Sequence, residues 1–148
     1  MPSRIAVRRC RAADLRSVLA IERASFAADA WPRELFVELL EECPRLFLLA
    51  IVEGRVAGYV AAVLRGETAE LVSIAVHPGC RGRGVAGALM RRVIALLRRD
   101  GIGQCWLMVR PGNRAAIRLY RAFGFAPARR VKDYYGRGRG GLRMRVQL

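Results

Sequence analysis

The sequence is poor in the residues that bind metals and form disulfides. It has one histidine and four scattered cysteines without a CxxC pair. The common zinc spacings are therefore absent, and a disulfide framework is not expected in a chain of 148 residues. No apolar run approaches the roughly 18–20 residues that span a bilayer, and the charged first ten residues hold no signal core. These absences predict a cytoplasmic protein with one domain, no metal and no membrane contact.

Lysine is also nearly absent, since 26 of the 27 basic residues are arginine. Residues 1–76 hold ten arginines and ten acidic residues, whereas residues 77–148 hold 17 basic and two acidic residues and carry the whole net charge of +15. A basic half favours a polyanionic partner, such as a phosphorylated cofactor, a nucleic acid or an acidic protein face. A proteome-wide preference for arginine would look the same. The arginines are not interleaved with a stacking platform, so no specific nucleic-acid binding is expected.

The spacing of the apolar residues predicts a mixed α/β fold with helices on the faces of a sheet. The expected strands cover 4–10, 47–53, 56–65, 69–76, 104–110, 126–132 and 142–147. The expected helices cover 12–26, with Leu15, Val18, Leu19 and Ala20 at helical spacing, about 32–42, with Pro32 as first residue, 85–99, and 113–123, with Asn113 as cap.

The most informative stretch joins the expected strand 69–76 to the helix 85–99. Glycines flank the start of this helix, where backbone N–H groups are unpaired and the helix dipole adds positive charge. Glycine lets the backbone approach a ligand, so successive amides can hold phosphate oxygens beside Arg81 and Arg83. The spacing is neither that of a Walker loop nor GxGxxG. A tight turn without a ligand would show the same glycines, so the pattern alone leaves both interpretations open.

Two ordered motifs resemble the GNAT N-acetyltransferases. Residues 81–86, Arg-Gly-Arg-Gly-Val-Ala, resemble the [QR]xxGx[GA] acyl-CoA signature, and 107–125, LMVRPGNRAAIRLYRAFGF, resembles the strand-Asn-helix-Tyr-GF segment of the ribosomal-protein N-terminal, RimI-like branch. The resemblance covers most of the chain from about Ile5 and is weakest before residue 50. It implies one N-acetyltransferase domain over 1–148, with a mostly antiparallel mixed sheet of about seven strands and about four helices.

The resemblance also implies where acetyl-CoA, the acetyl donor, would bind. Backbone groups of Ile74, Ala75 and Val76 would pair with the pantetheine arm as if it were an added strand. Asn113 would contact the cofactor farther along. The pyrophosphate would be held by the turn formed by Arg81, Gly82, Arg83, Gly84, Val85, Ala86 and Gly87.

The catalytic groups follow the family in one position and depart from it in another. Tyr120 matches the tyrosine that protonates the departing thiolate, although a core aromatic on an amphipathic helix would look similar. Met108 stands where the branch has a carboxylate base. Glu70 resembles the base position of the histone-acetyltransferase branch, and a surface glutamate is the alternative. Glu22, placed on the acceptor side of the site, and a water chain are two further candidates.

The missing carboxylate bears on the choice of acceptor. An α-amino group has a pKa of about 7.7–8.0, so roughly a tenth is neutral near pH 7, whereas lysine, with a pKa of about 10.4, is neutral at well under about 0.1%. Tyr134 and Tyr135 resemble the tyrosines that the branch places over a peptide's first residues, with strand-edge aromatics as the alternative.

The sequence therefore predicts direct transfer of acetyl to an amine, preferably a protein or peptide N-terminus. No covalent enzyme intermediate is expected, because no cysteine or serine in the motifs has a base nearby. A small-molecule amine as acceptor, and a CoA-binding sensor that has lost catalysis, remain the alternatives.

Overall fold

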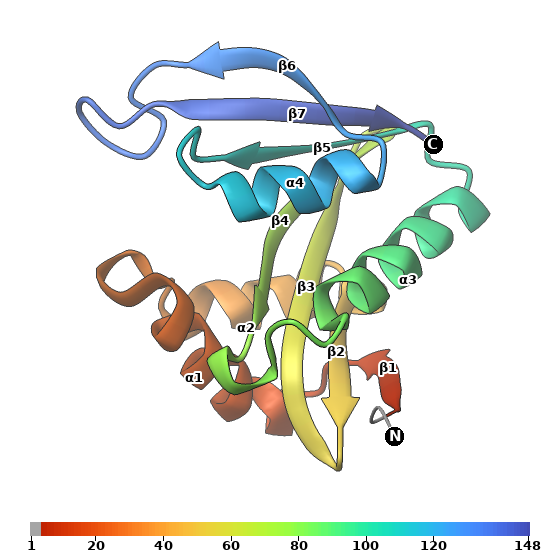
Figure 1. Cartoon of the computed structure of the whole chain (residues 1–148). Coiled ribbons are helices and arrows are strands. Elements are labelled where there is room, and N and C mark those ends of the chain that lie inside the picture. Colours follow the sequence, from red (N-terminus) through yellow and green to blue (C-terminus); the bar gives the residue numbers. More distant parts are fainter. Residues whose placement is uncertain (1–3) are drawn as a thin grey trace.

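The computed structural model describes residues 4–148, and a seven-stranded sheet organises them (Figure 1). The strands are β1 (Ile5–Arg9), β2 (Phe47–Val52), β3 (Arg55–Arg65), β4 (Thr68–Val76), β5 (Gln104–Val109), β6 (Ala126–Val131) and β7 (Gly141–Gln147). The α-helices of the described chain are α1 (Leu15–Phe26), α2 (Arg33–Glu42), α3 (Val85–Arg99) and α4 (Arg114–Ala122). The strand order is β1-β2-β3-β4-β5-β7-β6. Only β4 and β5 pair in parallel, which confirms the predicted mixed, mostly antiparallel sheet.

Each face of the sheet has its own hydrophobic core. Leu15 and Val18 of α1 and Phe36 of α2 pack with Tyr59 of β3 on one face, and we call this the α1–α2 core. On the other face, six buried residues of α3 pack with alternate residues of the strands and with part of α4 to form the α3 core. The alternation of side chains along each strand sends neighbouring residues into different cores.

Two helices begin later than the sequence predicts. Pro32 was expected as the first residue of the second helix, but its extended backbone, with ψ at 161°, makes it the N-cap, and α2 begins at Arg33. The first helix was expected from residue 12, but Ala12–Asp14 forms a 3₁₀ turn and α1 begins at Leu15. Asp14 accepts hydrogen bonds from Arg8 and from a backbone amide there, which favours the tighter turn.

The buried face of α1 also differs from the prediction at one position. Ala20, which was expected on the apolar face, is exposed, whereas Ile21 and Glu22 are buried. A period of 3.6 residues from Val18 leads to 21 and 22 rather than to 20. Glu22 is 2% exposed and is the one buried charged residue of the described chain.

A one-residue bulge in β4 changes which side chains face which core. Ala61 pairs with Ser73, and the next residue of β3 pairs with Leu71, so Val72 has no partner in the ladder. Leu71 packs in the α3 core, whereas Ser73 faces the side of α1. Glu70 lies opposite a residue of the α1–α2 core. The bulge therefore places Glu70 and Ser73 on the same face, although they are three residues apart.

Strands β4 and β5 part soon after they meet. Their pairing covers Thr68–Glu70 and Gln104–Trp106, and the two strands then run apart (Figure 1). From residue 71 to residue 76, the β5-facing edge of β4 has no other described strand beside it. We call the region between residues 71–76 and 107–109 the β4–β5 opening.

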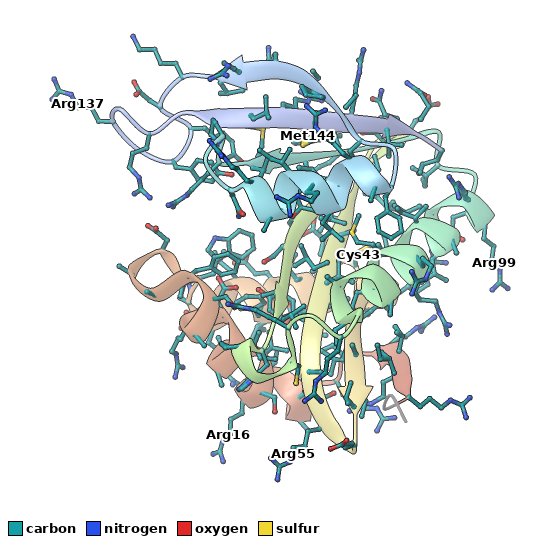
Figure 2. The ribbon with its side chains drawn as sticks, in the orientation of Figure 1. Arg16, Cys43, Arg55, Arg99, Arg137 and Met144 are labelled. Carbon is teal, nitrogen blue, oxygen red and sulfur yellow. The ribbon has the colours of Figure 1, made fainter. Side chains whose placement is uncertain are left out.

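The basic residues lie mainly on the surface. Arg16, Arg55, Arg99 and Arg137 project away from the ribbon (Figure 2), and all of them are exposed. The four cysteines carry free thiols. None of the described helices is both long and apolar enough to cross a membrane.

Candidate active site at the β4–β5 opening

The turn between β4 and α3 has the backbone geometry that its glycines allow. Gly82 and Gly84 have φ angles of 78° and 81°, in the left-handed region that glycine adopts without strain. Gly84 is the N-cap of α3, so the amides of Val85, Ala86 and Gly87 in the first turn lack intrahelical partners. A Cβ added at Gly82 or Gly84 would meet nothing within 4 Å. The turn therefore has open space beside free amides and fits a phosphate group.

The two arginines of this turn behave differently. The Nε of Arg81 donates to the carbonyl oxygen of Val76 at 3.2 Å, and its second guanidinium nitrogen donates to Ser25 Oγ at 3.3 Å. Arg81 therefore ties the turn to β4 and α1. Arg83 is exposed and has no ion pair with a described residue, so it is the freer of the two charges.

The other predicted donor-side residues lie on β4 and at the start of α4. Ile74, Ala75 and Val76 lie on the unpaired edge of β4, although the Arg81 bond occupies the Val76 carbonyl. Asn113 is the N-cap of α4, and its side-chain oxygen accepts a hydrogen bond from the Ala116 amide at 3.2 Å. The NH₂ group of Asn113 is therefore the part left for a ligand.

Gly58 of β3 sets how closely α3 approaches the sheet. A Cβ at this position would lie 2.8 Å from the Ala75 carbonyl oxygen and 3.1 Å from a methyl group of Val85. The missing side chain lets the first turn of α3 pack directly on β3 and β4. The N-terminus of the helix is thereby fixed beside the open strand edge.

Tyr120 lies on the inward face of α4 and is 7% exposed. Its ring packs against Phe125, with centroids 5.9 Å apart. Burial raises the pKa of the Tyr120 phenol, and Tyr135 raises it further. Tyr120 in turn contributes to the raised pKa of Tyr59. A phenol with a raised pKa stays protonated through the physiological range, as a proton donor must.

Glu70 lies at the closed end of the β4–β5 opening, opposite Trp106 of β5. Its side chain is 14% exposed, and its Oε1 accepts a hydrogen bond from Arg65 Nε at 3.2 Å. Burial raises the pKa of Tyr134, and the Glu70 charge adds to that shift. Glu70 therefore faces the acceptor side, and its charge is already paired with a guanidinium.

Met108 and Tyr134 meet at Gly141. A Cβ at Gly141 would lie 2.7 Å from the Met108 methyl carbon and 3.1 Å from Tyr134 Cβ. The neighbours of Met108 on β5, Leu107 and Val109, are buried in the α3 core, so Met108 points to the opposite face, which Glu70 shares. Where the RimI-like branch has a carboxylate, this chain thus presents the apolar side chain of Met108 near Tyr134.

Three loops distant in sequence meet beside Tyr134 and Tyr135. Asp29, between α1 and α2, pairs with Arg110 after β5 at 2.8 Å and with Arg139 before β7 at 3.1 Å. The Arg110 guanidinium also lies over the Tyr135 ring, 4.9 Å from its centroid, and Tyr135 packs edge-on against Tyr134. Hydrogen bonds from Arg110 and Arg139 hold the pKa of Asp29 below its usual range. We call Asp29, Arg110 and Arg139 the loop latch.

Glu22 begins a buried chain of polar groups. The Trp31 amide donates to Glu22 Oε2 at 2.8 Å, and the Tyr59 hydroxyl donates to Glu22 Oε1. The Tyr59 oxygen also lies 2.8 Å from Ser73 Oγ. Three polar side chains from α1, β3 and β4 therefore form one chain that ends at the β4 bulge.

Sequence reasoning missed Tyr59, Ser73 and the loop latch. The signal for the first two was a polar atom in each of two apolar strands that a short turn joins. The latch had no local signal, since Asp29 and Arg139 are 110 residues apart. The described chain also holds no group of three His, Cys, Asp or Glu side chains that could bind a metal.

A mixed sheet that splits beside a glycine turn at a helix N-terminus offers an unpaired strand edge and an anion-binding turn, as a phosphorylated cofactor requires. Residues 15–125 match the model of the Acetyltransferase (GNAT) family, and the chain belongs to that family. The predicted family is therefore confirmed. The chain is an acetyl-CoA-dependent N-acetyltransferase.

Relatives of the chain include N-terminal acetyltransferases. A Bacillus subtilis protein provisionally assigned as a ribosomal protein bS18-alanine N-acetyltransferase is 32% identical over 136 residues, which cover 91% of this chain and 89% of that protein. The crystal structure of Ard1 from Thermoplasma volcanium has a TM-score of 0.92, 28% identity and 97% coverage of both chains. The ribosomal-protein-S18-alanine N-acetyltransferase from Escherichia coli has a TM-score of 0.85 and 25% identity, with 97% of this chain and 94% of that chain covered.

Proposed function

We propose that the enzyme acetylates the α-amino group of a protein or peptide N-terminus. The observation that carries this proposal is the acceptor side of the opening, where Met108 and Tyr134 present an apolar and aromatic surface instead of a carboxylate. An amine that is already partly neutral needs less help from a base, and an α-amino group meets that condition better than lysine. The relatives from Bacillus subtilis and Escherichia coli are named as ribosomal-protein-S18-alanine N-acetyltransferases.

The donor would bind along the unpaired edge of β4 and over the turn 81–87. The N-terminal amides of α3 would hold the pyrophosphate, and Arg83 would add charge. The pantetheine arm would then run back along residues 76 to 74, so that the thioester lies near Ser73 and Tyr120. The amine nitrogen would attack the acetyl carbonyl carbon directly, and Tyr120 would give its proton to the departing sulfur.

The acceptor would enter between the loops that the loop latch joins. Tyr134 and Tyr135 would cover the first residues of a peptide, as their counterparts do in the N-terminal branch. The Asp29 pairs would hold the α1–α2 connection against the turn before β7, which narrows the entrance. A narrow entrance favours a flexible chain end over a lysine on a folded surface.

A matched set of peptides tests this proposal. One peptide carries a free N-terminal alanine and an acetylated lysine, and the second carries an acetylated N-terminus and a free lysine in the same sequence. Spermine serves as the small amine. We expect the first peptide to be acetylated fastest, as measured by CoA thiol release and mass spectrometry of the product. Faster turnover of the lysine peptide or of spermine would contradict the proposal, and CoA binding without any turnover would point to a sensor.

A further inference from the structure

We infer that Ser73, Tyr59 and Glu22 form a proton relay that deprotonates the acceptor amine in place of the missing strand carboxylate. This inference rests on the proposed acetyl transfer and names the base for it. The proton would travel from the amine to Ser73 Oγ, from Ser73 to the Tyr59 hydroxyl, and from Tyr59 to the Glu22 carboxylate.

The direction of the hydrogen bonds follows from the number of protons. The Glu22 carboxylate can only accept, so the single Tyr59 proton points to Glu22 Oε1. The Tyr59 oxygen must then accept from Ser73, at 2.8 Å. Ser73 thus uses its proton on Tyr59, and its lone pairs are left to accept a hydrogen bond from an amine. The chain is polarised in the direction that a base requires.

The hydrogen-bonded chain of the relay ends at Ser73, where the proposed reaction needs the acceptor nitrogen to lie. Ser73 is half-buried and directly precedes Ile74, the first residue of the strand edge expected to hold the pantetheine arm. The bulge at Val72 turns Ser73 toward the acceptor face. Bulges are common beside active sites because they re-aim a side chain in this way.

The Glu22 end of the relay is held in place and shielded from water. Glu22 is 2% exposed, and the Trp31 amide fixes its second oxygen at 2.8 Å. Around Tyr59, α2 and β2 contribute the apolar rings of Phe36 and Phe47. Tyr120 of α4 acts on Tyr59 from a neighbouring element, Cys10 lies in the same core, and Glu70 lies on the same face of β4 as Ser73. Glu70 already pairs with Arg65, whereas no described cation pairs with Glu22.

The protons balance over one turnover. The relay takes one proton from the acceptor ammonium and leaves a neutral amine and a protonated Glu22. The C–N bond then forms and the C–S bond breaks, and the sulfur takes the proton of Tyr120. The nitrogen loses a second proton as the amide forms, which restores Tyr120. Glu22 returns its proton along the same chain to solvent after the product leaves.

The test compares kcat/KM from pH 6 to pH 9 for variants of the relay, with the free-alanine peptide as substrate. Tyr59→Phe and Ser73→Ala should each lower kcat/KM by about 10–100-fold at pH 6.5. The loss should shrink to about twofold at pH 9, where the amine is neutral without help. Ser73→Thr should keep near wild-type rates because it keeps the hydroxyl. Phe36→Leu, which loosens the packing around Tyr59 but removes no proton carrier, should lower the rate by the same factor at every pH.

Two results would overturn the relay. One is a loss in Tyr59→Phe and Ser73→Ala that is constant across the pH range, which is what a packing role produces. The other is a pH-dependent loss in Glu70→Gln that Ser73→Ala does not share. If Tyr59→Phe fails to fold, the Ser73→Ala and Ser73→Thr pair decides alone. If wild type acetylates a different amine, the proposed acceptor is wrong. The same variants are then assayed with that amine, so a wrong acceptor and a wrong relay can be told apart.

Discussion

The two walls of the β4–β5 opening are built in different ways. The donor wall consists of residues 74–76 and 81–87, a nearly continuous piece of chain that offers backbone amides. The acceptor wall consists of side chains from four separate parts of the chain: Glu22 of α1, Tyr59 of β3, Glu70 and Ser73 of β4, and Tyr134 between β6 and β7. A backbone site tolerates changes in side chain as long as the glycines keep the turn open, whereas a side-chain site changes with each residue. The difference explains how Met108 can replace a carboxylate while the donor wall keeps the family pattern.

The largest expected effect lies where the walls meet, at Tyr120. Removing the proposed proton donor in Tyr120→Phe should lower kcat by about 10²–10⁴-fold and leave acetyl-CoA affinity nearly unchanged. The control Phe125→Leu alters the packing of the same ring and should change kcat far less. Because the pKa of Tyr120 is raised, the wild-type kcat should not fall as the pH rises to about 10, above the ordinary pKa of tyrosine. Full kcat in Tyr120→Phe would make Tyr120 a core residue.

The donor wall is tested by comparing two glycines at opposite ends of α3. Gly84 and Gly101 have φ angles of 81° and 75°, and both would place a Cβ in open space. Valine at either position should therefore cause similar backbone strain. Gly84→Val should weaken acetyl-CoA binding by about tenfold or more, since its side chain would fill the space for the phosphates, whereas Gly101→Val should not. Calorimetric titration measures both, and equal affinities would remove the pyrophosphate turn from the proposal.

The acceptor wall is tested at the position of the missing carboxylate. Met108→Glu should raise kcat/KM by a few-fold near pH 6, where neutral amine is scarce, and have little effect at pH 9. Glu70→Gln should change the rate by less than about threefold at any pH if Ser73 receives the proton. A pH series on one peptide measures both variants. A loss of kcat/KM at low pH in Glu70→Gln would instead support the role as base that the sequence predicted for Glu70.

The smallest effect is expected at the loop latch. Asp29→Asn removes the charge that joins Arg110 and Arg139 and should raise the KM for a peptide by about twofold to threefold, the scale of an exposed ion pair. The two hydrogen bonds lower the pKa of Asp29, so the latch is complete above the ordinary pKa of aspartate and is lost as the pH falls through the lowered value. The KM should not change between pH 6 and pH 9 for this reason. The control is Glu38→Gln, which changes an exposed acid on α2. An equal change of KM in both variants would show that the loop latch has no role in peptide binding.

The sequence predicts the fold well and locates the glycine turn because both signals are local. Apolar periodicity identifies each strand and helix, and the glycine turn follows directly after β4. Errors occur at helix ends, where Pro32 and Asp14 act through turn geometry rather than periodicity. On the acceptor wall, the sequence named Glu22 and Glu70 but not the bonds that they make. Those bonds depend on strand pairing, and the β4 bulge changes which residues share a face.

The unpaired Val72 has a consequence for how this strand can evolve. Val72 is an extra residue in the strand, so the alternation of side chains between the two faces of the sheet is shifted by one residue after it. Deleting this single residue would join Leu71 to Ser73, which already pair with consecutive residues of β3 and face opposite sides, so the two faces would be kept and only the local bend lost. A one-residue insertion or deletion at a regularly paired position of β4 would instead exchange the two sides of the strand beyond it. Val72 is thus the position at which the length of β4 can change without exchanging the contents of the site and of the α3 core.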